Sequence, residues 1–325
     1  MTRRSLPRRA RGAAILLALL IMTLVATLAA GMVWLQWRGI EVEAADRARG
    51  QGQWLLNAAL DWGDLILRSQ IRNGHVQDDL TQPWATPLAE TKLSSFLSAD
   101  GSHAASEDSG PDAYLSGQIT DAQSKYNLYN LVADTRNETV RFELLCAQIN
   151  VAQSTCAAIA SNFTMSWDGA SNVTSAQDHA QAVLMPQTLA DLAWYGVDAK
   201  TIQQLEPYVV LIPPPPGQPL QVTKINANTA AAPVLAVAAS GVQAMANNLV
   251  QQRQQNPFKS TRDIENALGG LTQDVGLLTF QSDYFEIYGQ LRYEQHVIRE
   301  RSLVWRQNAA LVTVLHRVRL PPDAQ

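Results

Sequence analysis

The residue types that most often carry out catalysis are present in this sequence, but their spacing matches no catalytic pattern. The sequence lacks GxSxG, GxxxxGK[ST], HExxH, CxxC and GxGxxG, the patterns of nucleophile, phosphate, zinc and dinucleotide sites. Asp61 and Asp64 could form an acid–base pair, but a solvated helix face explains their spacing better. We therefore expect a protein that is not an enzyme. Its five histidines then serve as surface or strand polar residues: His75, His103, His179, His296 and His316.

Acidic loops offer a second kind of chemistry, because carboxylate oxygens are good ligands for calcium. Neither candidate group has the DxDxDG spacing of a strong calcium loop, and a solvated acidic loop is the simpler interpretation. The sequence therefore indicates no certain cofactor and leaves the metal open, with calcium as the candidate. The two groups are Asp100, Glu107, Asp108 and Asp112, and Asp168 with Asp178.

Cys146 and Cys156 are the only cysteines of the chain, and nine residues lie between them. In an oxidising compartment such a pair can close a small loop through a disulfide. In the cytoplasm two buried thiols would be the default interpretation. The compartment of this part of the chain therefore decides between the two, and export favours the disulfide.

The N-terminal segment decides the compartment. The 25 residues from Ala13 to Trp37 contain no charged residue or histidine, and as a helix they would extend about 37 Å, enough to cross a bilayer. A cleaved secretion signal is the alternative, with a cleavage site at Thr27–Gly31, but the apolar run continues past it. The positive-inside rule keeps the N-terminus in the cytoplasm and exports the rest, because five arginines precede the run: Arg3, Arg4, Arg8, Arg9 and Arg11.

The exported part is long enough for a sizeable core and is acidic. Of 25 lysines and arginines, five lie in the N-terminal cluster, which leaves 20 against 29 acidic residues, a net charge of about −9. No proline interrupts residues 13–72, so one helix can serve as both anchor and spine of the domain. Its amphipathic face is predicted at Leu55, Ala59, Trp62 and Ile66, and Asn73–Gly74 end it.

The rest of the sequence combines strands with a large helical section. Strand patterns occur at 114–119, 283–293 and 303–320, and helical spacing occurs between 140 and 205. The proline run at 212–219 is a stiff spacer between two helical halves. In the second half, Ser260 with Asp263 three residues later predicts a helix N-cap. We therefore expect an α+β fold with an antiparallel sheet and a helical insert.

Four stretches carry a resemblance to the minor pseudopilin K family of type II secretion, over nearly the whole chain. They are the leader RGAAILLALL at Arg11, the spine AAGMVWLQW at Ala29, ITDAQSKYNLYNLV at Ile119, and KINANTAAAPVL at Lys224 with NPFKSTRDI at Asn256. The family motif residues that match are Asp121, Asn127, Asn130, Asn226, Asn228, Thr229, Pro257 and Phe258.

The resemblance implies a fold and a set of domains. The fold would combine a long transmembrane and spine helix, a pilin-like α/β domain and an inserted all-α domain with helix-hairpin-helix (SAM-like) repeats. The domains would be a prepilin leader at 1–12, a transmembrane helix at 13–37, a periplasmic spine at 38–74, a pilin-like frame at 75–120 and 279–320, and the insert at 121–278 with its linker at 212–224.

It also implies a function in assembly. Prepilin peptidase would cut between Gly12 and Ala13, and Ala13 would be N-methylated. Filament pilins carry glutamate five residues after the cut, where this chain has Leu17. That carboxylate pairs with the terminal amine of an adjacent subunit, so Leu17 and the bulky insert indicate a position at the pseudopilus tip. Expected partners are the other minor pseudopilins, the major pseudopilin, prepilin peptidase, the inner-membrane assembly platform and membrane lipid.

Two alternatives share part of these features. A type IV pilus minor pilin would have the leader but is expected to lack the double helical insert. A membrane-anchored helix-hairpin-helix DNA-binding protein would need a glycine-rich hairpin and a basic face. Here the hairpin Ala238–Gln243 has one glycine, and residues 227–252 contain no lysine or arginine, so no nucleic acid partner is expected.

Overall fold

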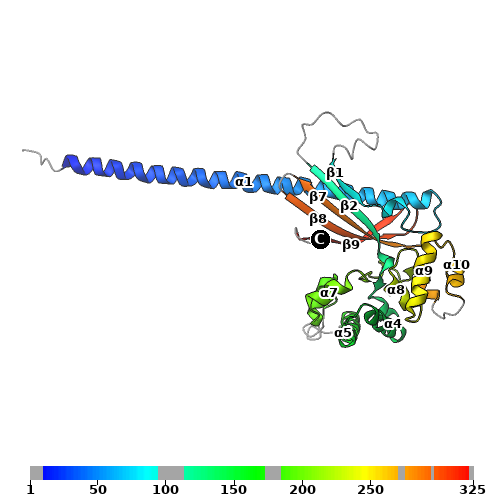
Figure 1. The fold of residues 1–325 in the computed structure, drawn as a ribbon. Coiled ribbons are helices and arrows are strands. Elements are labelled where there is room, and N and C mark those ends of the chain that lie inside the picture. The colour runs from blue at the N-terminus through cyan, green and yellow to red at the C-terminus, as the bar shows by residue number, and fades with distance from the viewer. Residues whose placement is uncertain (1–9, 94–112, 173–183, 270–274, 294–295, 322–325) are drawn as a thin grey trace, which may run out of the picture. The chain divides into compact units, whose positions relative to one another are not determined.

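The computed structural model describes the chain except for residues 1–9, 94–112, 173–183, 270–274, 294–295 and 322–325, and Figure 1 shows it as a ribbon. The chain divides into two compact units, residues 1–55 and 56–325. The described residues of the first unit all lie in one long helix, α1 (Ala10–Arg72). A window of 18 residues in this helix has a mean hydropathy of 2.6, and none of it is buried. The helix is therefore long and apolar enough to cross a membrane, as the sequence predicts.

In the second unit, the last turns of α1 pack on a sheet. The buried face recurs at intervals of four, three and four residues, as expected for a helix covered on one side. The sequence predicts this face one residue too early, at Leu55, Ala59, Trp62 and Ile66. The structure buries Leu56, Leu60, Gly63 and Leu67 instead.

The sheet has five antiparallel strands in the order β1-β2-β7-β8-β9. Along β7, half-buried and buried residues alternate, which is the two-residue period of a strand. The strand pattern predicted at 303–320 is divided between the end of one strand and the whole of the next. The strands are β1 (Leu88–Lys92), β2 (Ala113–Asp121), β7 (Tyr284–Tyr293), β8 (His296–Arg306) and β9 (Val312–Leu320).

Two glycines allow close approach around this sheet. A Cβ atom at Gly289 would lie 2.9 Å from a methyl group of Leu56, so the missing side chain lets α1 sit close to the sheet. A Cβ atom at Gly117 would lie 2.9 Å from the backbone oxygen of Tyr288 on the neighbouring strand. The α+β class, with a long apolar N-terminal helix and an antiparallel sheet, is thus confirmed.

The chain between β2 and β7 is mainly helical and has its own core. Phe142, Phe163, Leu192 and Leu235 are fully buried in one hydrophobic cluster. The predicted cap is confirmed, since the hydroxyl of Ser260 accepts a hydrogen bond from the amide of Asp263. The helices are η2 (Ala122–Ser124), α3 (Asn130–Ala133), α4 (Thr135–Gln148), α5 (Gln153–Asn172), η3 (Leu189–Tyr195), α7 (Ala199–Leu205), α8 (Ala232–Ala238), α9 (Gln243–Gln255), α10 (Thr261–Ala267) and η4 (Val275–Leu277), and η1 (Pro83–Ala85) precedes β1.

Two very short parallel strand pairs hold this helical section together. β3 (Tyr126–Asn127) pairs with β4 (Val209–Val210), and β5 (Ile225–Asn226) pairs with β6 (Leu278–Thr279). In each pair the first strand follows a lysine and contains an asparagine. The two pairs enclose the two helical halves, and the proline-rich stretch 212–219 lies between them.

Candidate functional site

The N-terminal residues predicted to be processed lie in the first turns of α1. This helix begins at Ala10, so Gly12, Ala13 and Leu17 all have helical backbone. The side chain of Leu17 is 61% exposed on the helix surface. The helix therefore presents an apolar side chain at this position, where filament pilins carry a carboxylate. Cleavage and methylation stay predictions.

A buried polar cluster joins the sheet to the helical section, and its centre is Asp121 at the end of β2. One carboxylate oxygen, Oδ2, accepts three hydrogen bonds, from Asn226 Nδ2 at 2.8 Å, Thr229 Oγ1 at 2.6 Å and Ser282 Oγ at 2.6 Å. The other oxygen, Oδ1, accepts one from the amide of Gln123 at 2.8 Å. We call this cluster, with the ion pair described next, the polar hub.

The ion pair of the hub is Asp78 with Arg306. Arg306 Nη2 lies 2.6 Å from Asp78 Oδ2, and both side chains are about 95% buried. The same nitrogen donates to the backbone oxygen of Ser282 at 2.6 Å, and the guanidinium lies 4.7 Å from the ring centroid of Phe285. The amide of Ser282 donates to Asp78 at 2.9 Å. The hub thus ties the segment after α1 to β8, to the start of β7 and to Asp121.

The remaining motif asparagines act as clamps on loops. Asn127 donates to and accepts from the backbone of Ile212, and Asn130 does the same with Thr223, so the two hold both ends of the proline-rich linker. Asn228 makes the same two-bond contact with Phe258, which follows Pro257. Each asparagine satisfies a loop backbone that has no strand or helix partner of its own.

Burial raises the pKa of Asp121 from its usual 3.8 to about 6. The main cause is desolvation of the fully buried carboxylate, and the hydrogen bonds from Ser282, Thr229 and Asn226 oppose it, while nearby Asp78 raises the pKa further. The folded chain therefore holds a proton at Asp121 that the unfolded chain has already released between pH 4 and 6.

This difference predicts that the folded state loses stability as the pH rises. Between pH 5 and 7 the free energy of unfolding should fall by roughly 1 kcal/mol through Asp121 alone, since the folded state binds more protons there. Denaturant unfolding of the full chain in detergent micelles checks this, with Asp121→Asn as the comparison. The variant should have a smaller slope with pH, whatever its absolute stability. An unchanged slope would contradict the assignment.

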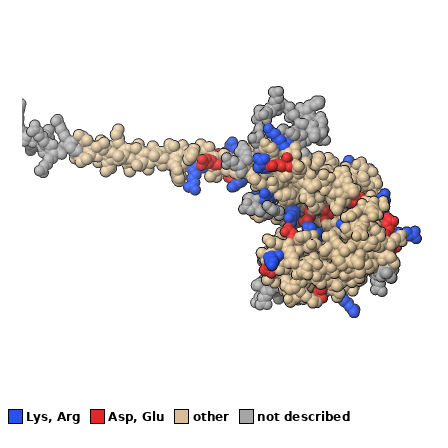
Figure 2. All heavy atoms as spheres, in the orientation of Figure 1, with Lys and Arg blue, Asp and Glu red and all other residues tan. Residues whose placement is uncertain are grey.

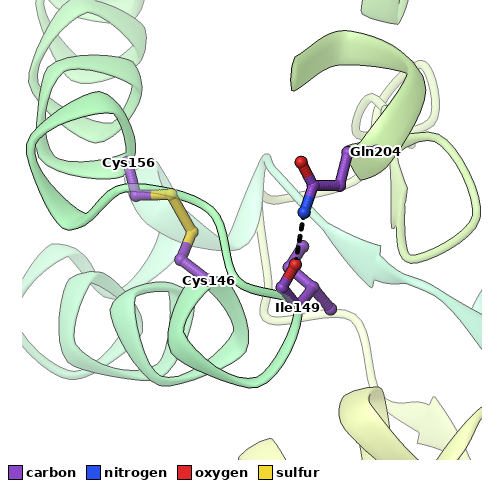
Figure 3. Close-up of a disulfide and its surroundings, with 4 residues drawn as sticks. All are labelled: Cys146, Ile149, Cys156 and Gln204. Atoms are coloured by element: carbon purple, nitrogen blue, oxygen red, sulfur yellow. Dashed lines mark hydrogen bonds between the residues drawn. A yellow bond between two sulfur atoms is a disulfide. The ribbon is translucent and has the colours of Figure 1, made fainter. Parts of the chain in front are cut away.

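Cys146 in α4 and Cys156 in α5 are joined by a disulfide, as Figure 3 shows. Both sulfurs are fully buried, and the bond fastens two consecutive helices across a short connection. In the same connection, the backbone oxygen of Ile149 accepts a hydrogen bond from Gln204 Nε2 in α7 at 2.5 Å. The disulfide and this hydrogen bond fix the turn between α4 and α5.

We expect the double variant Cys146→Ser/Cys156→Ser to lower the free energy of unfolding by about 2–3 kcal/mol, because the unfolded chain regains the entropy of a ten-residue loop. Denaturant unfolding measures this, and the oxidised wild type treated with reductant gives the same comparison without mutation. Equal stability of the oxidised and reduced wild type would show that the bond contributes nothing.

The sequence-predicted residues therefore fall into separate groups. Asp121, Asn226 and Thr229 meet in the hub, whereas Asn127, Asn130 and Asn228 clamp loops near it. Sequence reasoning missed Asp78, Ser282 and Arg306. The signal at Asp78 and Arg306 was a charged residue in a turn-like or strand-like stretch, and Ser282 had none. Among the described residues no group of three His, Cys, Asp or Glu side chains could hold a metal. Most of the calcium candidates lie outside the described residues: Asp100, Glu107, Asp108, Asp112 and Asp178.

Two comparisons with known proteins found a match, one to a segment of the sequence and one to the fold. Residues 225–285, from Ile225 in β5 to Phe285 in β7, match the family model "Type II secretion system (T2SS), protein K". No curated protein matches the chain. A chain in the crystal structure of the GspK-GspI-GspJ complex from the enterotoxigenic Escherichia coli type 2 secretion system has a similar fold. Its TM-score is 0.58 at 18% identity, over 85% of this chain and 98% of that chain.

The matched segment contains five residues of the hub and its clamps, Asn226, Asn228, Thr229, Phe258 and Ser282, and so coincides with the part of the head where the sheet meets the helical section. The similar structure extends the same fold over the rest of the head. Residues 225–285 are thus similar to the type II secretion system protein K family, and the fold is similar to that of a chain in the GspK-GspI-GspJ complex.

Proposed function

We propose that this chain is a minor pseudopilin of the type II secretion machinery. It initiates and caps the pseudopilus tip with other minor pseudopilins, so that folded proteins are exported across the outer membrane. The observation that carries the proposal is the family match at residues 225–285, the segment that supplies Asn226 and Thr229 to the polar hub. The role is structural, and the chain is not an enzyme.

The proposed location is the inner membrane, with a single pass. Residues 13–37 would form the membrane span, residues 1–12 a cytoplasmic leader, and residues from 38 onward the periplasmic part. The long apolar helix α1 supports this, as do the arginines before it. Prepilin peptidase would cut after Gly12, and Ala13 would become the methylated N-terminus.

The tip position rests on two features. Leu17 offers no carboxylate to the terminal amine of another subunit, and its apolar side chain is exposed to lipid or to a partner helix. The helical section between β2 and β7 adds bulk that a closely packed shaft would have to accommodate at every subunit. A subunit at the end of the filament needs no such carboxylate, and its bulk does not have to fit between other subunits. Partners of the GspI and GspJ kind, which accompany GspK in the similar crystal structure, would lie beneath it.

We also propose that α8 and α9 form a helix-hairpin-helix unit that does not bind nucleic acid. The two helices are bent by 117° at a short turn in which Ser240 and Gly241 have positive φ. The basic residue of α9, Arg253, donates hydrogen bonds to the backbone oxygens of Ala227 and Ala230 and is half-buried. It is engaged inside the unit, so it would not neutralise a phosphate outside it.

Co-purification tests the proposed function. The full chain, co-expressed with the I and J pseudopilins of its own bacterium and extracted in detergent, should co-elute with both. The minor pilins of a type IV pilus from the same bacterium serve as the matched control and should not co-elute. Co-elution with the pilins and not with the pseudopilins would reverse the assignment.

A further inference from the structure

One edge of the sheet is open. β9 spans nine residues and pairs with β8 along its length, from Arg306 with Val312 to Arg299 with Leu320. Among the described residues no strand pairs with its other side. The outward backbone groups of an edge strand can pair with another chain, and proteins usually block them with a proline, a short strand or an inward charge. β9 contains no proline and is as long as β2. Its register against β8 shifts between Val314 and His316, so the regular edge available for pairing is His316–Leu320.

A groove runs beside this strand. It has a volume of about 660 Å³ and lies between the sheet and the helical section. Val318 and Leu320 of β9 form one wall with Leu303, and Leu189, Ile202 and Val209 of the helical section line the other. Two ion pairs join the walls, Arg301 with Glu206 and Lys125 with Glu286, each at 3.2 Å. Figure 2 shows charged side chains of both signs in the hollow between these two parts of the head.

The hairpin that carries this edge is basic in an acidic protein. Residues 296–320 contain five arginines and two histidines against a single acid, Glu300. Without this hairpin and the five N-terminal arginines, the chain has 15 basic and 28 acidic residues. Arg306 pairs with Asp78 in the polar hub, and Arg319 lies 3.7 Å from the buried carboxylate of Glu300, while its own side chain is 62% exposed. The local charge therefore favours an acidic partner segment.

We propose that β9 binds an extended acidic segment of a partner protein as an additional strand of the sheet. Successive side chains of a strand point to opposite faces, so apolar residues at alternate positions would enter the groove beside Val318 and Leu320. The acidic residues between them would lie on the opposite face, where Arg319 is exposed, whereas Arg317 already donates to Ser302 and Asn57. Main-chain hydrogen bonds would supply much of the affinity, and the groove and the arginines the selectivity. This proposal goes beyond the proposed function, because it can be tested with no other pseudopilin present.

The test uses the full chain in detergent micelles and a fluorescent nine-residue peptide of alternating valine and glutamate. A peptide with lysine in place of glutamate tests charge, and the glutamate peptide with alternate backbone nitrogens methylated tests strand pairing. Empty micelles correct for non-specific uptake. The glutamate peptide should bind at least tenfold more tightly than either control, and its binding should slow hydrogen exchange of the β9 amides.

Variants locate the site on the chain. Arg319→Glu, at an exposed side chain, and Val318→Asp, in the groove wall, should each weaken binding at least tenfold. The matched control is Glu90→Lys on β1, the opposite edge strand, which should leave binding unchanged. Thermal unfolding confirms that each variant is folded. Equal binding of the two unmethylated peptides, no loss on backbone methylation, or equal effects of the β1 and β9 variants would overturn the proposal. So would salt-sensitive binding of duplex DNA in place of the peptide.

Discussion

Replacing Asp78 with alanine is expected to lower the free energy of unfolding of the head by about 3–5 kcal/mol. The substitution leaves Arg306 as a buried charge without its counterion, and uncompensated buried charges carry costs of this size. In the native chain, Arg306 Nε and Nη1 have no hydrogen-bond partner among the described residues, so both hydrogen bonds of the guanidinium are made by Nη2. Denaturant unfolding of the full chain in detergent micelles measures the loss.

Two further variants separate the buried charge from general damage to the protein. The double variant Asp78→Ala/Arg306→Met removes both charges and should recover part of the loss. Glu90→Ala breaks the exposed pair with Arg292, whose side chains are 40–45% exposed, and should cost less than about 1 kcal/mol. If Asp78→Ala and Glu90→Ala were equally stable, the buried ion pair of the polar hub would not stabilise the head.

Gly12→Val is expected to block processing, so that the full-length precursor accumulates in the membrane. The peptidase must approach the backbone at the scissile bond, and a β-branched side chain beside that bond obstructs it. We expect at least a tenfold lower fraction of cleaved protein. The mass of the protein extracted from membranes gives this fraction directly, because cleavage removes residues 1–12.

The matched control is Gly31→Val in the same helix. A Cβ atom at Gly31 would meet nothing within 4 Å, so this substitution changes helix propensity and bulk to the same extent at a distance from the cut. Processing of Gly31→Val should equal that of the wild type. Equal cleavage of the two variants would place the processing site elsewhere.

The parts of this protein that were predictable from sequence are those governed by local patterns. An uncharged run of 25 residues predicts the apolar helix, and the alternating pattern from Tyr284 predicts β7, because burial on one side imposes a period on the sequence. Asp121, Asn226 and Thr229 were found through a family motif, in which short stretches of sequence can be matched directly.

The parts that were not predictable depend on contacts between distant residues. Asp78, Ser282 and Arg306 meet in the hub although more than 200 residues separate Asp78 from the other two, and no local pattern marks such a meeting. The register of α1 was wrong by one residue for a related reason. Gly63 is buried because the helix approaches Ile287 closely there, while apolar Trp62 beside it is 38% exposed. A periodicity of apolar residues cannot show that a glycine belongs to the packed face.

We propose that this chain is a processed pseudopilin whose apolar helix stays attached to the head. Mass analysis of the N-terminus of the membrane-extracted protein tests it most directly. We expect a species that begins at Ala13 and carries one methyl group on its terminal amine. A protein that begins near Ala30 and is found in the soluble periplasmic fraction would contradict it.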